Sequence, residues 1–187
     1  HLFLTKFLSA LSFFGGAYVF FLIARIYKPE KKFTLLLLFL WNPLLLFEFI
    51  QNGHLDSVMI FFLLLFVYLF LKKEFSWAAF ALALAISTKY IPLLLAPFLL
   101  KAASGHRLKV FFIMLGVILF LFLPFWRGTD MLQGLFDQAS RSYFMIAGPL
   151  PALISFIWPS YPPDLALPVL WISRFVCILV LAFFFWF

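Results

Sequence analysis

The sequence is short of charge, and of acidic charge above all, because only 7 of its 187 residues are Asp or Glu against 14 Lys or Arg. A chain that is 66% hydrophobic and 11% charged does not describe a soluble domain, so a surface that mostly faces lipid is expected. Cysteine is nearly absent as well, since Cys177 is the only one. A single cysteine excludes an internal disulfide bond and a cysteine-rich metal site.

Motifs for nucleotide chemistry are also missing. The sequence contains no Walker motif, no glycine-rich nucleotide loop, no HExxH and no nucleophile elbow, so a soluble active site fed by nucleotides is unsupported. The net charge of +7 would suggest nucleic acid only if the basic residues formed a stripe. They lie instead in short loops between apolar runs, which is the positive-inside pattern, and no nucleic-acid partner is expected.

Long apolar runs are abundant, and 30 of the residues are Phe. The runs are continuous rather than alternating, which argues for transmembrane helices and against strands. We therefore predict an all-α, polytopic transmembrane helical bundle of about six to seven membrane segments, in a single domain over residues 1–187. The chain starts at His1 and stops inside an apolar run, which we interpret as a fragment of a larger integral membrane protein that lacks the N-terminal part.

Loops and helix breakers divide the apolar sequence into segments. The first helix is expected over residues 2–27, and a second apolar run covers 33–50, with a kink or an end at Pro43. A third helix is expected over 56–71, and a further one over 110–126.

Residues 76–100 allow two interpretations, either one tilted helix or a hairpin of two short helices broken at Lys89-Tyr90-Ile91-Pro92. We prefer the hairpin because it keeps the basic loops on one side of the membrane. Residues 127–164 then form a long outer segment rich in Pro, Gly and Tyr, with a surface helix near 130–143. The last helix is expected to start near Leu165.

Polar residues interrupt the apolar sequence most strongly between positions 48 and 56, where five occur within nine positions: Glu48, Gln51, Asn52, His54 and Asp56. Ionisable groups beside lipid are costly, so such a cluster lines a wet cavity or lies at an interface. Glu48, Asn52 and Asp56 share one face if the turn through Gly53 stays helical. If Gly53 ends the helix, Asn52 caps one helix and Asp56 opens the next. The bland alternative is a plain turn, with Asp56 as a first-turn residue.

Two basic residues are also unusual in their positions. Lys89 interrupts an apolar stretch, and it either snorkels to the outer interface or directs its ammonium group at an anionic substrate. In the hairpin, its turn would lie on the same outer face as the polar cluster. Tyr90 beside it is typical of an aromatic belt. Arg174 lies well inside the last apolar run, where it would pair with a carboxylate such as Glu48 or bind a lipid phosphate.

Taken together, these residues resemble a known family. The segments WNPLLLFEFIQNGHLDSVMIFFLLLFVYLFL and ALALAISTKYIPLLLAPFLL are similar to the membrane core of GT-C glycosyltransferases. They look most like polyprenol-phosphate-mannose-dependent mannosyltransferases, namely glycosyltransferase family 87 and the catalytic subunit of GPI mannosyltransferase I. The resemblance covers residues 34–100 and rests on an Asn-Pro, a Glu, an Asn-Gly-His-x-Asp that opens a helix, and a Thr-Lys-Tyr followed by prolines.

The resemblance implies a multi-pass hexosyltransferase that moves mannose from a polyprenyl-phosphate donor to a lipid or glycan acceptor on the outer or lumenal face. It would reside in the plasma membrane of a prokaryote or the ER membrane of a eukaryote, among membrane lipids. The resemblance also implies a catalytic carboxylate upstream of His1, so the catalytic residue stays unknown here. The candidate substrate-binding residues are Glu48, Asn52, His54, Asp56, Lys89, Tyr90 and Arg174. No cofactor is assigned, and the carboxylates are compatible with a divalent cation.

Two other classes of protein stay open. A transporter or flippase would use Glu48, Asp56 and Lys89 as a pathway near the bilayer midplane, whereas a transferase site should lie at the outer interface. The expected position of residues 51–56 at the outer edge favours the transferase. A non-catalytic scaffold subunit would keep its activity after substitution of Asp56 or Lys89 and lose only stability.

Overall fold

The structure, a computed structural model, describes residues 2–126 and 128. The chain divides into two compact units, His1–Pro124 and Phe125–Phe187, and almost all of the second lies outside the described residues. The described part is helical and contains no strand, so the all-α prediction is confirmed there. The predicted outer segment 127–164 and the helix with Arg174 fall outside the described residues, apart from Gly128. The single domain over residues 1–187 stays a prediction.

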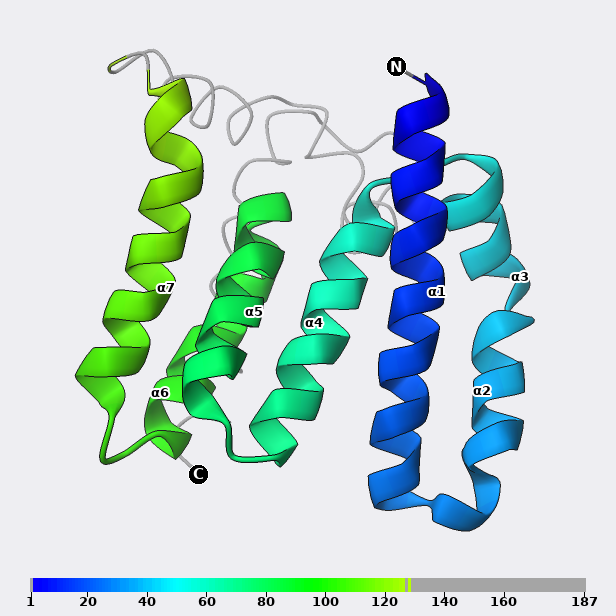
Figure 1. Ribbon diagram of the computed structural model, residues 1–187, viewed down its shortest axis with the longest axis horizontal. Coiled ribbons are helices and arrows are strands. Elements are labelled where there is room, and N and C mark those ends of the chain that lie inside the picture. The colour runs from blue at the N-terminus through cyan, green and yellow to red at the C-terminus, as the bar shows by residue number, and fades with distance from the viewer. Residues whose placement is uncertain (1, 127, 129–187) are drawn as a thin grey trace, which may run out of the picture. The chain divides into compact units, whose positions relative to one another are not determined.

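The first two helices are antiparallel neighbours. Helix α1 (Leu2–Tyr27) has the predicted bounds and leads through η1 (Pro29–Lys31) into α2 (Lys32–Leu40), which returns beside it (Figure 1). Aromatic rings hold the pair together, because the ring of Phe39 stacks on Phe13 at 5.7 Å and on Phe20 at 5.0 Å. Helix α1 therefore has one side committed to α2.

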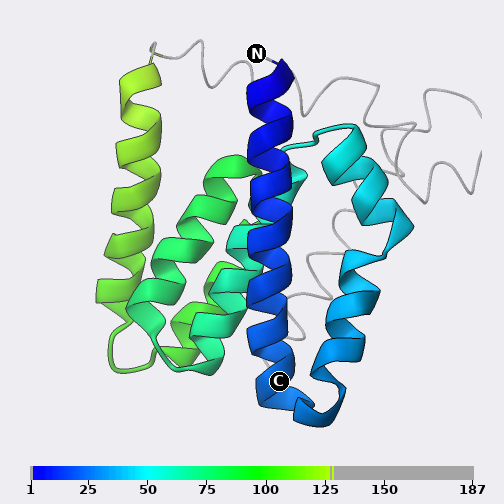
Figure 2. The same cartoon turned by 45° about the vertical axis from the view of Figure 1, so that its right-hand side comes forward.

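The predicted break at Pro43 is confirmed. Helix α2 ends at Leu40, and the short α3 (Pro43–Leu45) begins after Asn42, whose Oδ1 accepts hydrogen bonds from the backbone N–H groups of Leu44 and Leu45. Proline has no N–H to give to the preceding turn, so the ladder of hydrogen bonds is interrupted there. The chain continues as a π-helix, η2 (Leu46–Gln51), and bends by 44° at the break. Figure 2 shows the change of direction after α2.

The remaining helices form two further hairpins. Helix α4 (Asp56–Leu71) has the predicted bounds and is followed by α5 (Phe75–Thr88), η3 (Ile91–Leu95), α6 (Ala96–Ala102), α7 (Arg107–Phe122) and η4 (Leu123–Phe125). Lys89 has an extended backbone, and η3 and α6 return along α5, so the hairpin is observed and the single tilted helix is not. In Figure 1 the loops α1–α2, α4–α5 and α6–α7 lie at one end of this unit.

The core lies where α5 packs against α4 and α7. The sequence of α5 is rich in alanine, and its inward positions are buried: Ala78, Ala79, Ala81, Leu82, Ala83 and Ala85. Small side chains let neighbouring helix backbones approach closely, and this is the usual way in which helices associate in lipid. Glycines do the same between α1 and α4, because a Cβ on Gly15 would lie 3.0 Å from the ring of Phe61.

The predicted six to seven membrane segments are not supported. Among the described residues, two helices are long and apolar enough to cross a membrane, Phe3–Tyr27 and Arg107–Phe125, or three if the bent pair Pro29–Leu40 and Pro43–Gln51 forms one span. Helix α4 has 16 residues, and at about 1.5 Å per residue it reaches only about 24 Å, against a hydrocarbon core of about 30 Å. Long apolar runs therefore became shorter helices separated by turns.

Candidate functional site

The polar cluster of the sequence forms a tight turn between η2 and α4. The π-helix ends at Gln51, and Gly53 adopts a positive φ of 70°, which a residue with a Cβ rarely adopts. Gly53 therefore ends the helix, and the alternative with a continuous helical face through Glu48, Asn52 and Asp56 is wrong. Asp56 opens α4 as its first residue, as the second alternative stated.

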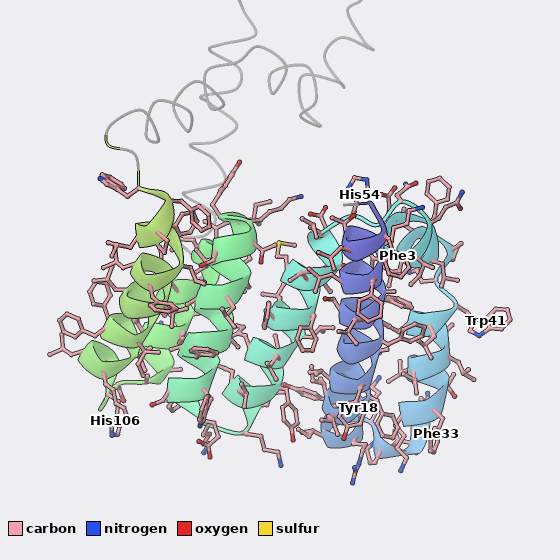
Figure 3. All side chains as sticks on the ribbon, turned by 45° about the horizontal axis from the view of Figure 1, so that its top comes forward. Phe3, Tyr18, Phe33, Trp41, His54 and His106 are labelled. Atoms are coloured by element: carbon pink, nitrogen blue, oxygen red, sulfur yellow. The ribbon has the colours of Figure 1, made fainter. Side chains whose placement is uncertain are left out.

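Two members of this segment form the first of two contacts between an acidic and a basic side chain, here called the charged pairs. Glu48 lies in the π-helix and His54 in the turn, and the His54 Nε2 atom lies 3.4 Å from Glu48 Oε2. The backbone supports the same contact, because the N–H of His54 donates to the carbonyl of Glu48 at 3.1 Å. Figure 3 shows His54 at the end of the unit where α1 begins. The side chains are 57% and 37% exposed, so both can reach a ligand.

Lys89 and Asp56 form the second pair and join parts of the chain that are distant in sequence. The Lys89 Nζ atom lies 2.6 Å from Asp56 Oδ1. Asp56 is fixed by the first turn of α4, and Lys89 follows the last residue of α5. Because α4 and α5 pack side by side and antiparallel, the start of one meets the end of the other. Lys89 is thus held by a carboxylate, which snorkelling alone would not produce.

Other candidate residues take a smaller part in this arrangement. Asn52 is exposed at the end of η2, where its backbone N–H donates to the carbonyl of Phe47 at 2.9 Å. Tyr90 is 66% exposed and lies between Lys89 and the first residue of η3. The partner of Glu48 within the described part is His54, whereas the suggested partner Arg174 lies outside it.

Sequence reasoning missed Ser9 of α1 and Ser57 of α4. Both are buried, and their hydroxyl oxygens lie 2.8 Å apart directly beneath the turn. The available signal was a set of small residues on α1 near Ser9, namely Ser12, Gly15 and Gly16, which is typical of close helix packing.

The polar groups of the site determine which ligands it can hold. It offers one ammonium group for an anion and two carboxylates that accept hydrogen bonds from hydroxyl groups. Within residues 2–126 and 128, no three side chains of His, Cys, Asp or Glu gather as metal ligands.

The described part of the chain has apolar helices long enough to span a membrane, and it has a charged cluster in the turn before α4. These features define the class of helical membrane proteins with a polar site. Comparison with known families narrows this class. Residues 1–105 match the family model of the MptA_B family, described as alpha-(1->6)-mannopyranosyltransferase, N-terminal domain. This chain belongs to that family, because the match covers more than half of it, and both charged pairs lie within the matched residues. No curated protein and no solved structure matches the chain.

Proposed function

We propose that this protein is a multi-pass membrane mannosyltransferase of the GT-C type that transfers mannose from a polyprenyl-phosphate donor to a lipid or glycan acceptor. Membership of a mannosyltransferase family supports transfer of mannose. The choice of a polyprenyl-phosphate donor is supported by the pair Lys89–Asp56. In this pair an ammonium group lies beside a carboxylate, where the start of α4 meets the end of α5.

Lys89 is proposed to bind the phosphate of the donor. When mannose leaves a lipid phosphate, negative charge grows on the phosphate oxygens, and a fixed cation stabilises that charge. The Lys89 side chain is 47% exposed, so a phosphate can approach it without unfolding the site. A bound phosphate would compete with Asp56 for the ammonium group.

The carboxylates are proposed to orient the sugar. Asp56, once released from Lys89, and Glu48 with its partner His54 are suited to accept hydrogen bonds from the hydroxyl groups of mannose or of the acceptor. Asn52 and Tyr90 are exposed beside these two pairs and are proposed to complete the contacts. In this proposal the site faces the outside or the lumen, in a plasma membrane or an ER membrane, and no cofactor is assigned.

Transfer assays with the full-length parent in native membranes test this proposal. The substrate is radiolabelled polyprenyl-phosphate mannose, with endogenous lipids as acceptors. Loss of a preorganised charge contact typically costs about 100-fold in turnover, so Lys89→Ala should lower transfer by that order at an unchanged protein level. Lys89→Arg should restore part of the activity because it keeps the positive charge.

Lys72→Ala is the matched control, because Lys72 is an exposed lysine at the opposite end of α4. It should leave transfer unchanged. Wild-type transfer by Lys89→Ala at an equal protein level would exclude Lys89 from the site. The absence of transfer from polyprenyl-phosphate mannose, glucose and arabinose alike would favour the transporter alternative instead.

A further inference from the structure

Ser9 lies on α1 but belongs to the turn that carries the charged pairs. Its side chain is fully buried, and its Oγ atom lies 2.7 Å from the carbonyl oxygen of Phe49 and 3.0 Å from that of His54. The Oγ atom of Ser57 lies 2.8 Å from Ser9 Oγ and 3.0 Å from the same His54 oxygen. One hydroxyl pair thus connects α1, η2, the turn and α4.

The hydroxyl protons limit how many hydrogen bonds this network can donate. Each serine has one hydroxyl proton, so the two serines supply two donated hydrogen bonds. The shortest contact indicates that Ser9 donates to Phe49. Ser57 then donates either to Ser9 or to His54. In this assignment the contact of Ser9 with the carbonyl of Phe49, at 2.7 Å, is the donated bond, and the carbonyl of His54, at 3.0 Å, is the more distant acceptor.

The carbonyl of Phe49 lies where the helix is irregular. Phe49 belongs to the π-helix Leu46–Gln51 and is itself buried, so water does not readily reach its backbone. A π-helical turn displaces carbonyl groups from their usual partners, and a buried carbonyl without a donor is unfavourable. The hydroxyl of Ser9 supplies that donor and thereby stabilises the irregular turn.

A second, independent contact holds the turn against the same helix. A Cβ on Gly53 would lie 2.8 Å from Lys6 Cγ and 3.4 Å from Lys6 Cα, so the turn backbone touches α1 directly. Lys6 and Ser9 are three residues apart and lie on one face of α1. The turn is therefore fixed to α1 at both of these positions.

We propose that Ser9 is a positioning residue: by its hydrogen bond to the π-helix, it sets the geometry of Glu48, His54 and Asp56 relative to Lys89. This inference rests on the proposed mannosyl transfer at that site. Ser9 does not touch the substrate. Its hydroxyl acts through the backbone, and its loss shifts the charged side chains without removing any of them.

The kinetic test compares Ser9→Ala, Ser9→Thr and Ser12→Ala in full-length protein, with kcat and donor KM measured separately at equal protein levels. A displacement of about 1 Å can cost about 100-fold in rate, so Ser9→Ala should lower kcat by about 10-fold or more, with a smaller change in KM. Ser9→Thr keeps the hydroxyl and should recover most of the turnover. Ser12 is also buried on α1, and among the described residues no hydrogen bond joins its hydroxyl to the turn, so Ser12→Ala should resemble the wild type.

A second measurement does not depend on any donor. In a Cys177→Ser background, Lys6→Cys and Gly53→Cys form a cysteine pair, since the Cβ positions lie 3.6 Å apart, within the range of about 3.5–4.5 Å found in disulfides. Oxidation should cross-link this pair rapidly, and adding Ser9→Ala should slow the cross-link several-fold. If Ser9→Ala does not accumulate, Ser9→Cys in the kinetic assay replaces the hydroxyl with a weaker donor and should still lower kcat.

The outcomes separate the two proposals. Slower cross-linking in a protein whose wild type transfers no mannose would retain the positioning role and reject the transferase. Normal cross-linking with wild-type kcat in Ser9→Ala, or in Ser9→Cys, would overturn the positioning role while leaving the transferase intact. If Ser9→Ala loses activity and Ser9→Thr does not restore it, the proposed positioning role of the Ser9 hydroxyl would also be rejected.

Discussion

Gly53→Ala should destabilise the protein more than the same substitution at the glycines that have no neighbour within 4 Å, namely Gly105, Gly116 and Gly128. Two contributions to the loss of unfolding free energy add at this position. Its φ of 70° places an alanine in the left-handed region, at about 1–2 kcal/mol. Its new Cβ would also lie 2.8 Å from Lys6 Cγ, and crowding of this kind costs about 1–3 kcal/mol. The sum predicts a loss of roughly 2–5 kcal/mol.

Alanine substitutions at other glycines of this chain distinguish the cost of the backbone conformation from the cost of crowding. Gly128 has a φ of 78° but nothing within 4 Å of an added Cβ, so Gly128→Ala should lose only the backbone term. Gly116 lies inside α7 with nothing within 4 Å, so Gly116→Ala should be neutral or stabilising by up to about 1 kcal/mol. In the double variant Lys6→Ala with Gly53→Ala, the crowding atom is removed, and the loss should fall to that of Gly128→Ala.

The assay is reversible unfolding of the purified protein in mixed micelles, with the free energy of unfolding obtained by titration with denaturing detergent. The expected order of stability is Gly116→Ala, wild type, Gly128→Ala and then Gly53→Ala. Equal losses at Gly53 and Gly128 would refute the contact between the turn and α1. Wild-type stability in Gly53→Ala would refute the left-handed turn itself.

Two further predictions concern the core and the charged pair. Leu82→Ala removes a fully buried side chain from α5 and should cost about 2–5 kcal/mol in the same unfolding assay, whereas Leu108→Ala, at a side chain 74% exposed, should change stability little. Asp56→Asn should lower kcat about 10-fold without a fall in protein level, and it should lower the donor KM because the carboxylate no longer competes with phosphate for Lys89. Equal losses of turnover and protein amount would make Asp56 structural.

Single helices were predicted well from the sequence where an apolar run lies between charged loops. The bounds of α1 and α4 agree with the prediction because a basic loop follows each helix and the apolar run fills it without a break. The number of membrane spans could not be predicted in the same way. Apolar composition measures how a residue partitions into lipid, and it does not report whether the backbone stays helical through Asn42-Pro43 or Gly53.

The contacts between the candidate residues were predicted in part, for a related reason. Asp56 and Lys89 stood out because charge is rare in this sequence, and the preferred hairpin brought their turns to one face. The direct contact between them depends on the antiparallel packing of α4 and α5, which no local pattern encodes. Ser9 gave no such signal, because a serine in an apolar helix resembles any other small residue until its partner carbonyl is known.

The breaks in the helices and the charged pairs have a common physical origin. A straight α-helix uses its carbonyls internally and brings together only side chains that are three or four residues apart in sequence. At the Gly53 turn and at Lys89 the chain leaves the helical path, and each departure brings a charged side chain to the pair that it forms. The carbonyls released by the irregular turn require a donor, and Ser9 provides it from a neighbouring helix. A continuous helix that stabilises a broken one therefore gives this cluster its geometry, and substitution of Ser9 should alter turnover although α1 carries none of the charged candidate residues.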